Sequence, residues 1–340
     1  MSAKVMVMMS GGVDSSVAAA LLRDQGHDVT GVTLKLWGGE SDSGCCSVGD
    51  VEDARRVAAQ LDIPHYVFNF SDDFDARVVD PYVAAYGAGT TPNPCVDCNR
   101  EMKWGRAFDR ARQLGFDYVA TGHHARVVRH ADGAPALARG VDPAKDQSYV
   151  LYMLDAEQLA HTLLPIGEMT KADVRVIAST LGLRTATKRE SMDVCFITRN
   201  GREAFLGARI PRRPGVLVAT DGEIIGSHDG IDAFTIGQRR RVGVAQGERR
   251  YVVDIDADAA RVVVGDRASL LRERAELRDL RLTRVPAEMT VQTRAHGTPV
   301  PARLEGNDIV FGEPQPRVAP GQVIACYDGD ICCGGGIVAT

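Results

Sequence analysis

The stretch VMVMMSGGVDS at residues 5–15 decides the fold, because an apolar run leads directly into a Ser/Gly-rich turn. An apolar, helix-forming run at residues 17–22 follows, so the pattern predicts a strand, a loop and a helix in succession. Such a loop leaves backbone N–H groups unpaired at a helix N-terminus, where they and the helix dipole attract phosphate. Its two glycines let an anion approach the backbone, and its two serines add hydroxyl donors. We therefore expect a nucleotide phosphate at this loop.

The first half of the chain alternates strand patterns with helix patterns. Strands separated by helices predict a doubly wound parallel sheet, whose ligands bind at the carboxyl ends of the strands. The opening loop and the pair Gly122-His123 would both lie at that edge. The expected strands are residues 29–36, 65–70 and 118–121, and the expected helices are residues 51–61, 71–86 (broken or kinked at Pro81), 102–114 and 171–181 (opened by a capping-box variant at Thr170).

Two insertions, residues 38–49 and 87–100, interrupt this alternation. In the second, Pro92 and Pro94 force extended backbone and exclude a helix, so we expect a surface loop. From about residue 210, short β-branched runs alternate with Gly-containing turns, which predicts small β domains and a C-terminal barrel. The expected domains are an α/β domain at residues 1–200, a small central β-rich domain at residues 201–272 and a β-barrel at residues 273–340.

The composition is that of an ordinary water-soluble protein, with 44% hydrophobic and 25% charged residues among 340. No apolar stretch approaches the roughly 18 residues that span a bilayer, and the N-terminus lacks the pattern of a signal peptide, so we expect a cytoplasmic location and no membrane partner. The net charge of −5 argues against a protein that simply coats nucleic acid. Residues 188–250, however, carry 12 basic and 8 acidic side chains, and this locally positive segment could meet a polyanion or be a solvated basic face.

The chain has eight cysteines, which in a cytosolic protein favour metal binding, catalysis or burial over a disulfide scaffold. Cys95-Val96-Asp97-Cys98 lies just before the helix expected at residue 102, where a thiolate is stabilised and its pKa falls. A C-x-x-C pair is also half of a zinc site, but Cys45-Cys46 and Cys332-Cys333 lack the spacing to complete one. A reactive or cluster-binding pair is favoured, with structural zinc and inert burial as alternatives. Cys195, beside apolar residues, would alone be typical of a core.

The opening loop resembles the SGGxDS pyrophosphate loop of enzymes that split ATP into AMP and pyrophosphate, and it is not a Walker A loop. From Lys4 to about Val338 the chain resembles the bacterial tRNA-specific 2-thiouridylases. The loop is shared with GMP and argininosuccinate synthetases, whereas the two cysteine motifs and the KDQ segment between them are far more specific. The matching segments are residues 10–15, TPNP at 91–94 followed by Cys98-Asn99, TGH at 121–123, KDQSY at 145–149, DVCF at 193–196, TIGQR at 235–239 and PGQ at 320–322.

This resemblance implies an adenine nucleotide alpha hydrolase-like fold and a reaction in two steps. O2 of a wobble uridine attacks the α-phosphate of ATP, with Mg²⁺ balancing the phosphate charge. Sulfur from a persulfide on Cys195, supplied by a cysteine desulfurase or a sulfur relay protein, then replaces AMP. Cys98 would release that sulfur, leaving a Cys98–Cys195 disulfide, which requires the two Cα atoms to come within about 7 Å at some stage. The implied ATP-binding residues are Met8, Met9, Ser10, Gly11, Gly12, Val13, Asp14, Ser15, Leu34 and Gly122.

The resemblance also implies residues for tRNA, whose anticodon base must leave its stack to enter the pocket. The target-base segment corresponds to Asn93, Pro94 and Cys95. The other positions implied to contact tRNA are His123, Lys145, Asp146, Gln147, Arg294, Ala295 and Gln322. Without the resemblance, His123 would be typical of a satisfied polar residue.

One position departs from the family pattern, because many members have Asp where this chain has Cys95. Cys95 supplies no carboxylate, although Asp97 lies nearby. Alternatively, Cys95, Cys98 and Cys195 could hold a [4Fe–4S] cluster with one open iron for hydrosulfide. Two other functions remain open: a different pyrophosphate-loop adenylating enzyme, such as an amide ligase, and a non-catalytic tRNA-binding homologue. The adenylating enzyme would not need both Cys98 and Cys195.

Overall fold

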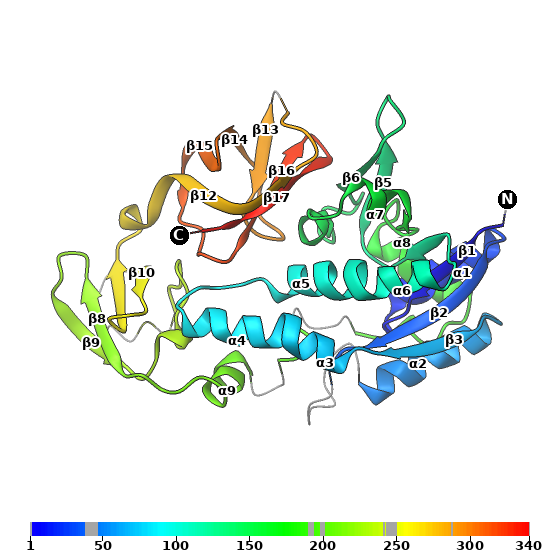
Figure 1. The fold of residues 1–340 in the computed structure, drawn as a ribbon, viewed down its shortest axis with the longest axis horizontal. Helices are drawn as coiled ribbons and strands as arrows, with labels where there is room; N and C mark the ends of the chain where they lie inside the picture. Colours follow the sequence, from blue (N-terminus) through cyan, green and yellow to red (C-terminus); the bar gives the residue numbers. More distant parts are fainter. Residues whose placement is uncertain are drawn as a thin grey trace. The chain divides into compact units, whose positions relative to one another are not determined.

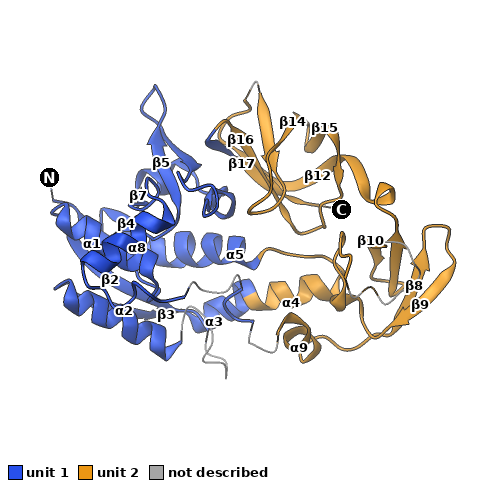
Figure 2. Ribbon diagram, turned by 180° about the vertical axis from the view of Figure 1, so that it is seen from behind, with its two compact units in different colours: residues 1–78, 94–199, 330–333 blue, residues 79–93, 200–329, 334–340 orange. Residues whose placement is uncertain are grey.

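The computed structural model describes residues 2–37, 47–189, 194–197, 201–240, 242, 250–286 and 288–339. The chain forms two compact units, which Figure 2 shows in different colours. Unit 1 comprises residues 1–78, 94–199 and 330–333, and unit 2 comprises residues 79–93, 200–329 and 334–340. Within the described ranges, no helix is long and apolar enough to span a bilayer.

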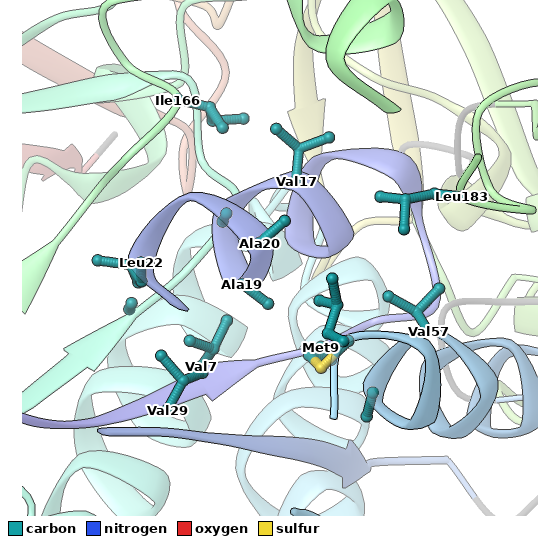
Figure 3. Close-up of a cluster of buried hydrophobic side chains, with 14 of the residues drawn as sticks. Val7, Met9, Val17, Ala19, Ala20, Leu22, Val29, Val57, Ile166 and Leu183 are labelled. Atoms are coloured by element: carbon teal, nitrogen blue, oxygen red, sulfur yellow. The ribbon is translucent and has the colours of Figure 1, made fainter. Parts of the chain in front are cut away.

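A five-stranded parallel sheet forms the centre of unit 1, with the strand order β3-β2-β1-β4-β7. Alternate residues of the first strand, Val5 and Val7, join one buried cluster with Met9, as the two-residue period of a strand requires (Figure 3). Helices α1, α2 and α8 supply most of the other side chains of this cluster, and Val29 of β2 and Ala120 of β4 also belong to it. The doubly wound parallel sheet is confirmed, and its elements are β1 (Lys4–Met8), α1 (Val13–Asp24), β2 (Asp28–Lys35), α2 (Val48–Gln60), β3 (His65–Asn69), β4 (Tyr118–Ala120), β7 (Thr162–Leu163) and α8 (Lys171–Thr180).

The prediction of a surface loop over residues 87–100 is wrong for its second half. Pro94 begins a helix, α5 (Pro94–Asp97), which continues as the π-helix η2 (Cys98–Ala107) and as α6 (Phe108–Gln113). Proline is tolerated in the first turn of a helix, because its missing N–H would have no partner there. The helix expected to begin at residue 102 therefore begins eight residues earlier, and both Cys95 and Cys98 lie inside it.

The segment expected as one helix at residues 71–86 is helical in three pieces. They are α3 (Ser71–Phe74), the π-helix η1 (Asp75–Val79) and α4 (Asp80–Gly87), with Pro81 in the first turn of α4 (Figure 1). Because proline cannot donate to the preceding turn, a change of helical geometry just before it is expected. The predicted break is absent, because the helix runs on through Pro81 and changes only from π to α geometry just before it.

A hairpin that the sequence patterns did not predict completes unit 1. Its strands β5 (Ala125–Arg129) and β6 (Pro135–Arg139) pair antiparallel, and β6 also pairs with Ile331 and Cys332 from near the end of the chain. The remaining short elements of this unit are the 3-10 helix η3 (Ser148–Leu151) and α7 (Ala156–Ala160).

Unit 2 contains the two β regions predicted for the second half. A four-stranded sheet has the order β10-β11-β8-β9, and a six-stranded barrel closes by pairing its first and last strands, β12 and β17. The barrel encloses an apolar core that includes Val291, Ile309 and Ile324, each fully buried. The elements are α9 (Gly201–Gly207), β8 (Gly215–Ala219), β9 (Ile224–His228), η4 (Ile231–Ala233), β10 (Tyr251–Asp256), β11 (Arg261–Gly265), η5 (Ala268–Leu270), β12 (Leu271–Leu282), β13 (Met289–Gln292), β14 (Val300–Glu305), β15 (Asp308–Pro316), β16 (Val323–Asp328) and β17 (Ile331–Val338).

Candidate functional site

The loop between β1 and α1 has the backbone geometry of an anion site. Helix α1 begins after Gly12, whose N-cap position has no side-chain hydrogen bond. Gly11 has φ +71°, and a Cβ there would lie 2.2 Å from the carbonyl oxygen of Asp50. The Ser15 hydroxyl accepts from the N–H of Ser10 at 3.2 Å and so holds the loop closed. The uncapped helix start leaves N–H donors for a bound anion, and glycine is required at position 11 for both conformation and space.

Asp14, in the same loop, is held by two side chains from other parts of unit 1. Lys171 Nζ donates to its two carboxylate oxygens at 2.7 and 2.6 Å, and His124 Nε2 lies 3.3 Å from Oδ1. Burial acts to raise the pKa of Asp14, but the hydrogen bonds from His124 and Lys171 outweigh it, so this pKa lies below its usual value. Asp14 is therefore a fixed carboxylate anion at the start of α1.

Lys188 makes a second ion-pair cluster at the same loop. Its Nζ donates to the Gly11 carbonyl at 3.0 Å, to Asp50 Oδ1 at 2.6 Å and to Asp53 Oδ2 at 2.7 Å. Burial acts to lower the pKa of Lys188, but these two carboxylates outweigh it and raise it above the usual value. Ser47 caps α2 by accepting from the Asp50 N–H at 3.1 Å, which fixes the helix end that carries both carboxylates.

The carboxyl ends of the strands bring the other predicted nucleotide residues to this edge of the sheet. Gly122 follows β4, and a Cβ there would lie 2.5 Å from the Ser15 backbone nitrogen. Only glycine therefore fits where this segment crosses the loop. Leu34 lies near the end of β2 and is buried, as are Met8 and Met9.

Cys95 and Cys98 lie in the first two turns of the helix that begins at Pro94, and both are partly exposed. Asn99, 2% exposed, anchors this helix by donating from Nδ2 to the Val150 carbonyl at 3.1 Å. Cys98 is the first residue of the π-helical segment, a geometry that is rare and frequent at functional sites. The expected position of the thiols near a helix N-terminus is thus retained, although the preceding segment differs from the expectation.

His123 is buried and neutral. Its Nε2 faces Lys103 Nζ at 3.3 Å, and its Nδ1 lies 2.7 Å from Thr121 Oγ1. Because an ammonium only donates, Nε2 accepts and the ring proton is on Nδ1. Burial, followed by the charge of Lys103, lowers the pKa of His123 well below its usual value. The ring also packs 5.5 Å from that of Trp104 on η2.

The segment Lys145-Asp146-Gln147 is a tight loop organised around the Asp146 carboxylate. Asp146 is 4% exposed and accepts from the N–H groups of Gly140 and Ser148, each at 3.0 Å, and from Arg139 Nη1 at 3.0 Å. The carboxylate thus shapes the loop from inside, while its two neighbours are partly exposed.

Cys195 lies in a short described stretch, residues 194–197, and is partly exposed. Its neighbour Phe196 is buried, with its ring centroid 5.8 Å from that of Phe74 and 6.1 Å from that of Trp37. Residues 190–193, which include Asp193 of the predicted motif, lie outside the described part of the chain, as does the pair Cys45-Cys46. Among the residues described, no three His, Cys, Asp or Glu side chains group as metal ligands, so we assign no ligand set and derive no step through a cluster.

Four predicted RNA-contacting residues belong to unit 2: Asn93, Arg294, Ala295 and Gln322. Gln322 Nε2 donates to the Thr91 carbonyl at 2.8 Å, which ties the Pro320–Gln322 turn to the segment just before Asn93. Buried Gln292 holds the carbonyls of Arg294 and Ala295 at 2.9 and 2.6 Å. The unit therefore supports these residues in two places, each fixed by one glutamine amide.

Sequence reasoning missed the side chains that hold the site together. They are His124, Lys171, Lys188 and Gln292. Each acts through a partner more than a hundred residues away or through backbone carbonyls, and none is part of a sequence motif with characteristic spacing. Only His124 could have been found from the sequence, because it directly follows Gly122-His123, the pair expected at the ligand-binding edge of the sheet.

Comparison with protein families matches three consecutive parts of the chain. They are the tRNA methyl transferase HUP domain at residues 3–199, the tRNA methyl transferase PRC-barrel domain at residues 203–266 and the aminomethyltransferase beta-barrel domain at residues 267–338. The chain is 46% identical to the tRNA-specific 2-thiouridylase MnmA of Roseiflexus sp. (strain RS-1), over 99% of both chains. It is 45% identical to that of Moorella thermoacetica, over 98% of this chain and 99% of the relative, and 44% identical to that of Herpetosiphon aurantiacus, over 99% of both. With such identity along its whole length, the chain belongs to the tRNA-specific 2-thiouridylase family.

Proposed function

We propose that this protein is a tRNA-uridine 2-sulfurtransferase, which uses ATP to replace O2 of the wobble uridine by sulfur. The observation that carries the proposal is a preorganised pyrophosphate loop in a chain that also has Cys98 in the first turns of a helix. The full-length identity to relatives named as tRNA-specific 2-thiouridylases supports the same reaction.

In the first step, residues 8–15 bind ATP, with the adenosine near Leu34 and Gly122. The loop N–H groups hold the β- and γ-phosphates, and Mg²⁺ accompanies ATP through the phosphate oxygens. O2 of the uridine attacks the α-phosphorus, a P–O bond forms, and pyrophosphate leaves. Lys188 neutralises Asp50 and Asp53, which would otherwise repel the triphosphate from the loop.

In the second step, the terminal sulfur of a Cys195 persulfide forms a bond to C2, and AMP leaves with the former uridine oxygen. The Cys98 thiolate attacks the inner sulfur of the persulfide, so the S–S bond breaks and a Cys98–Cys195 disulfide forms. A thiol reductant restores both cysteines. The persulfide comes from a cysteine desulfurase or a sulfur relay protein, which transfers sulfur to Cys195.

The proposed RNA-contacting residues come from several segments of the chain. Asn93, Pro94 and Cys95 meet the target base, and His123, Lys145, Gln147, Arg294, Ala295 and Gln322 contact the rest of the anticodon region. Asp146 acts by holding its loop in shape, since its carboxylate is occupied by four donors. We also propose the domain division 1–200, 201–272 and 273–340.

Three other activities are compatible with parts of the evidence. A different adenylating enzyme would share the loop, a non-catalytic homologue would share the tRNA surface, and methyl transfer is named in the descriptions of two matching families. Thiolation is favoured because it alone requires the thiols of both Cys98 and Cys195. A [4Fe–4S] cluster on Cys95, Cys98 and Cys195 is an alternative to the disulfide route; colourless, iron-free, fully active protein after anaerobic purification would exclude it.

The test is mass spectrometry of nucleosides from a tRNA transcript with an unmodified wobble uridine, after incubation with ATP, a cysteine desulfurase with cysteine as persulfide donor, and a thiol reductant. We expect 2-thiouridine, with AMP and pyrophosphate released in equal amounts. Methylated uridine without sulfur would favour methyl transfer. Pyrophosphate release without a thiolated base would favour another adenylating enzyme, and tRNA binding without pyrophosphate release would favour a non-catalytic homologue.

A further inference from the structure

His124 connects the pyrophosphate loop with the loop that carries Gln147. Its side chain is 4% exposed, and its Nε2 lies 3.3 Å from Asp14 Oδ1. Nδ1 is buried without a hydrogen-bond partner among the described residues, so the imidazole has one polar contact and that contact is Asp14. A buried ring nitrogen without a hydrogen-bond partner costs free energy, so this imidazole is held in place despite a cost to stability.

The backbone of the same residue is bound to Gln147 in both directions. The His124 N–H donates to Gln147 Oε1 at 2.9 Å, and the His124 carbonyl accepts from the Gln147 N–H at 2.8 Å. The side-chain NH₂ of Gln147 has no partner in the described part of the chain, so two donors remain for a ligand. Gln147 is therefore tied to His124 by its acceptor and still able to bind RNA by its donors.

The segment around His124 is closely packed, so a movement of Gln147 also moves His124. A Cβ on Gly122 would lie 2.5 Å from the Ser15 nitrogen, and a Cβ on Gly140 would lie 2.6 Å from the His124 carbonyl oxygen. Backbone therefore packs on backbone on both sides of the histidine. Close-packed segments of this kind transmit displacements rather than absorb them.

Lys171 provides the contrast. It lies at the start of α8 and binds the same Asp14 carboxylate at 2.6 Å, and its backbone N–H donates to Asp142 Oδ2 at 2.9 Å. Asp14 thus has one partner that strengthens the loop locally and one partner that also contacts the predicted RNA segment.

We propose that His124 is a positioning residue that makes the binding of ATP and tRNA cooperative. tRNA bound at Gln147 fixes His124, whose Nε2–H then holds Asp14 and the start of α1 in the geometry that binds the triphosphate. This inference depends on the proposed function, because it takes tRNA as the ligand of Gln147. It goes further by assigning the link between the two substrates to one hydrogen bond.

The test is a thermodynamic cycle on the full-length protein. The affinity for α,β-methylene-ATP is measured by calorimetry with and without a saturating tRNA transcript, and the ratio of the two dissociation constants gives the coupling factor. We expect about a tenfold factor for the natural chain, within the usual range of allosteric couplings, and the same factor for the effect of nucleotide on tRNA. His124→Phe, which keeps a ring of similar size but has no donor, should bring the factor within about twofold of unity.

The matched variant is His124→Gln, whose Nε2 can still donate to Asp14 and should retain most of the coupling. Lys171→Met should weaken nucleotide binding with and without tRNA and leave the coupling factor in place. Coupling in His124→Phe as strong as in the natural chain would overturn the proposal, and so would a natural chain that binds both ligands without coupling.

Failure of the proposed function looks different, since the natural chain would then fail to bind or thiolate tRNA at all. If His124→Phe does not fold, as judged by its melting temperature, Gln147→Leu breaks the other end of the link. Because the cycle compares ratios, a weaker tRNA affinity of this variant does not affect the result. A retained coupling factor in Gln147→Leu would overturn the proposal as well.

Discussion

The pyrophosphate loop and the helix that carries Cys98 are held in place by different forces. The loop is clamped by two lysines that lie far along the chain, Lys171 on Asp14 and Lys188 on Asp50 and Asp53. The helix is anchored mainly by burial, with Met102 and Trp104 almost completely inaccessible, and by hydrogen bonds from the side chains of Asn99 and Trp104 to Val150 and Thr162. The nucleotide end of the site therefore depends mainly on charge, whereas the thiol end depends mainly on packing.

The largest effect is expected from substitutions that remove the two reactive thiols and leave the packing around them unchanged. Cys98→Ser and Cys195→Ser should each reduce 2-thiouridine formation below detection, at least about a thousandfold, because a hydroxyl neither carries a persulfide nor attacks one at neutral pH. Nucleoside mass spectrometry provides the measurement. Cys326→Ala, in the barrel core, is the control that keeps both reactive thiols, and thiolation by either serine variant would contradict the assigned roles.

Packing of the helix can be weakened at Trp104, whose Nε1–H donates to Thr162 Oγ1 at 2.8 Å. Trp104→Phe should lower the free energy of unfolding by about 2 kcal/mol, since a hydrogen bond of about 1 kcal/mol is lost and a small cavity remains. Urea unfolding followed by circular dichroism measures the loss. Trp37→Phe, at a partly exposed site, should lower the free energy of unfolding by less. Equal decreases in the two variants would show that burial of Trp104 does not anchor this helix.

Charge at the loop can be tested with two cations that share Asp53. Lys188→Met leaves Asp50 without its lysine partner and Asp53 with only the more exposed Arg184, so we expect the KM for ATP to rise about tenfold. Arg184→Gln removes a more exposed cation, 3.2 Å from Asp53, that has no contact with Gly11, and should change KM by less than about twofold. Pyrophosphate release at varied ATP measures both, and similar changes in the two variants would refute a specific role for Lys188.

The smallest expected effect concerns pH and the buried ring of His123. Burial and the Lys103 charge lower its pKa in the folded state, so below about pH 6.5 the unfolded state binds a proton that the folded state does not. The free energy of unfolding therefore decreases as the pH falls through this value, by about 1.2 kcal/mol between pH 7 and 5.5. In His123→Phe, the free energy of unfolding should decrease by about 1.2 kcal/mol less than in the natural chain over this pH range. His65 and His228 remain in both proteins and contribute equally, so unchanged slopes would mean that His123 does not titrate in this way.

The sequence predicted the loop more completely than it predicted the helix. A strand, two glycines and a helix are local signals, and they gave the position of Gly11, Gly12 and Ser15 correctly. The helix was misjudged at its start because Pro94 was taken as a breaker, although a first-turn proline has no hydrogen bond to lose. The clamps of Lys171 and Lys188 could not be predicted, since a lysine carries no sign of which distant carboxylate it will meet after folding.

The β5–β6 hairpin was missed for a related reason. Its strands are short, only β6 is well buried, and β6 pairs further with Ile331 and Cys332, about two hundred residues along the chain. The barrel, in contrast, was predicted because its strands alternate regularly with turns such as Asp328-Gly329, which is a local pattern.

That late pairing has a consequence for synthesis on the ribosome. Unit 1 needs Asp330–Cys333 to cover the open edge of β6, and these residues are translated when almost the whole chain has been made. The nascent N-terminal unit therefore carries an unprotected strand edge for most of translation, and such an edge is a template for pairing with other chains. A product truncated before residue 330 would keep the nucleotide loop and both reactive cysteines and yet remain prone to aggregate through β6.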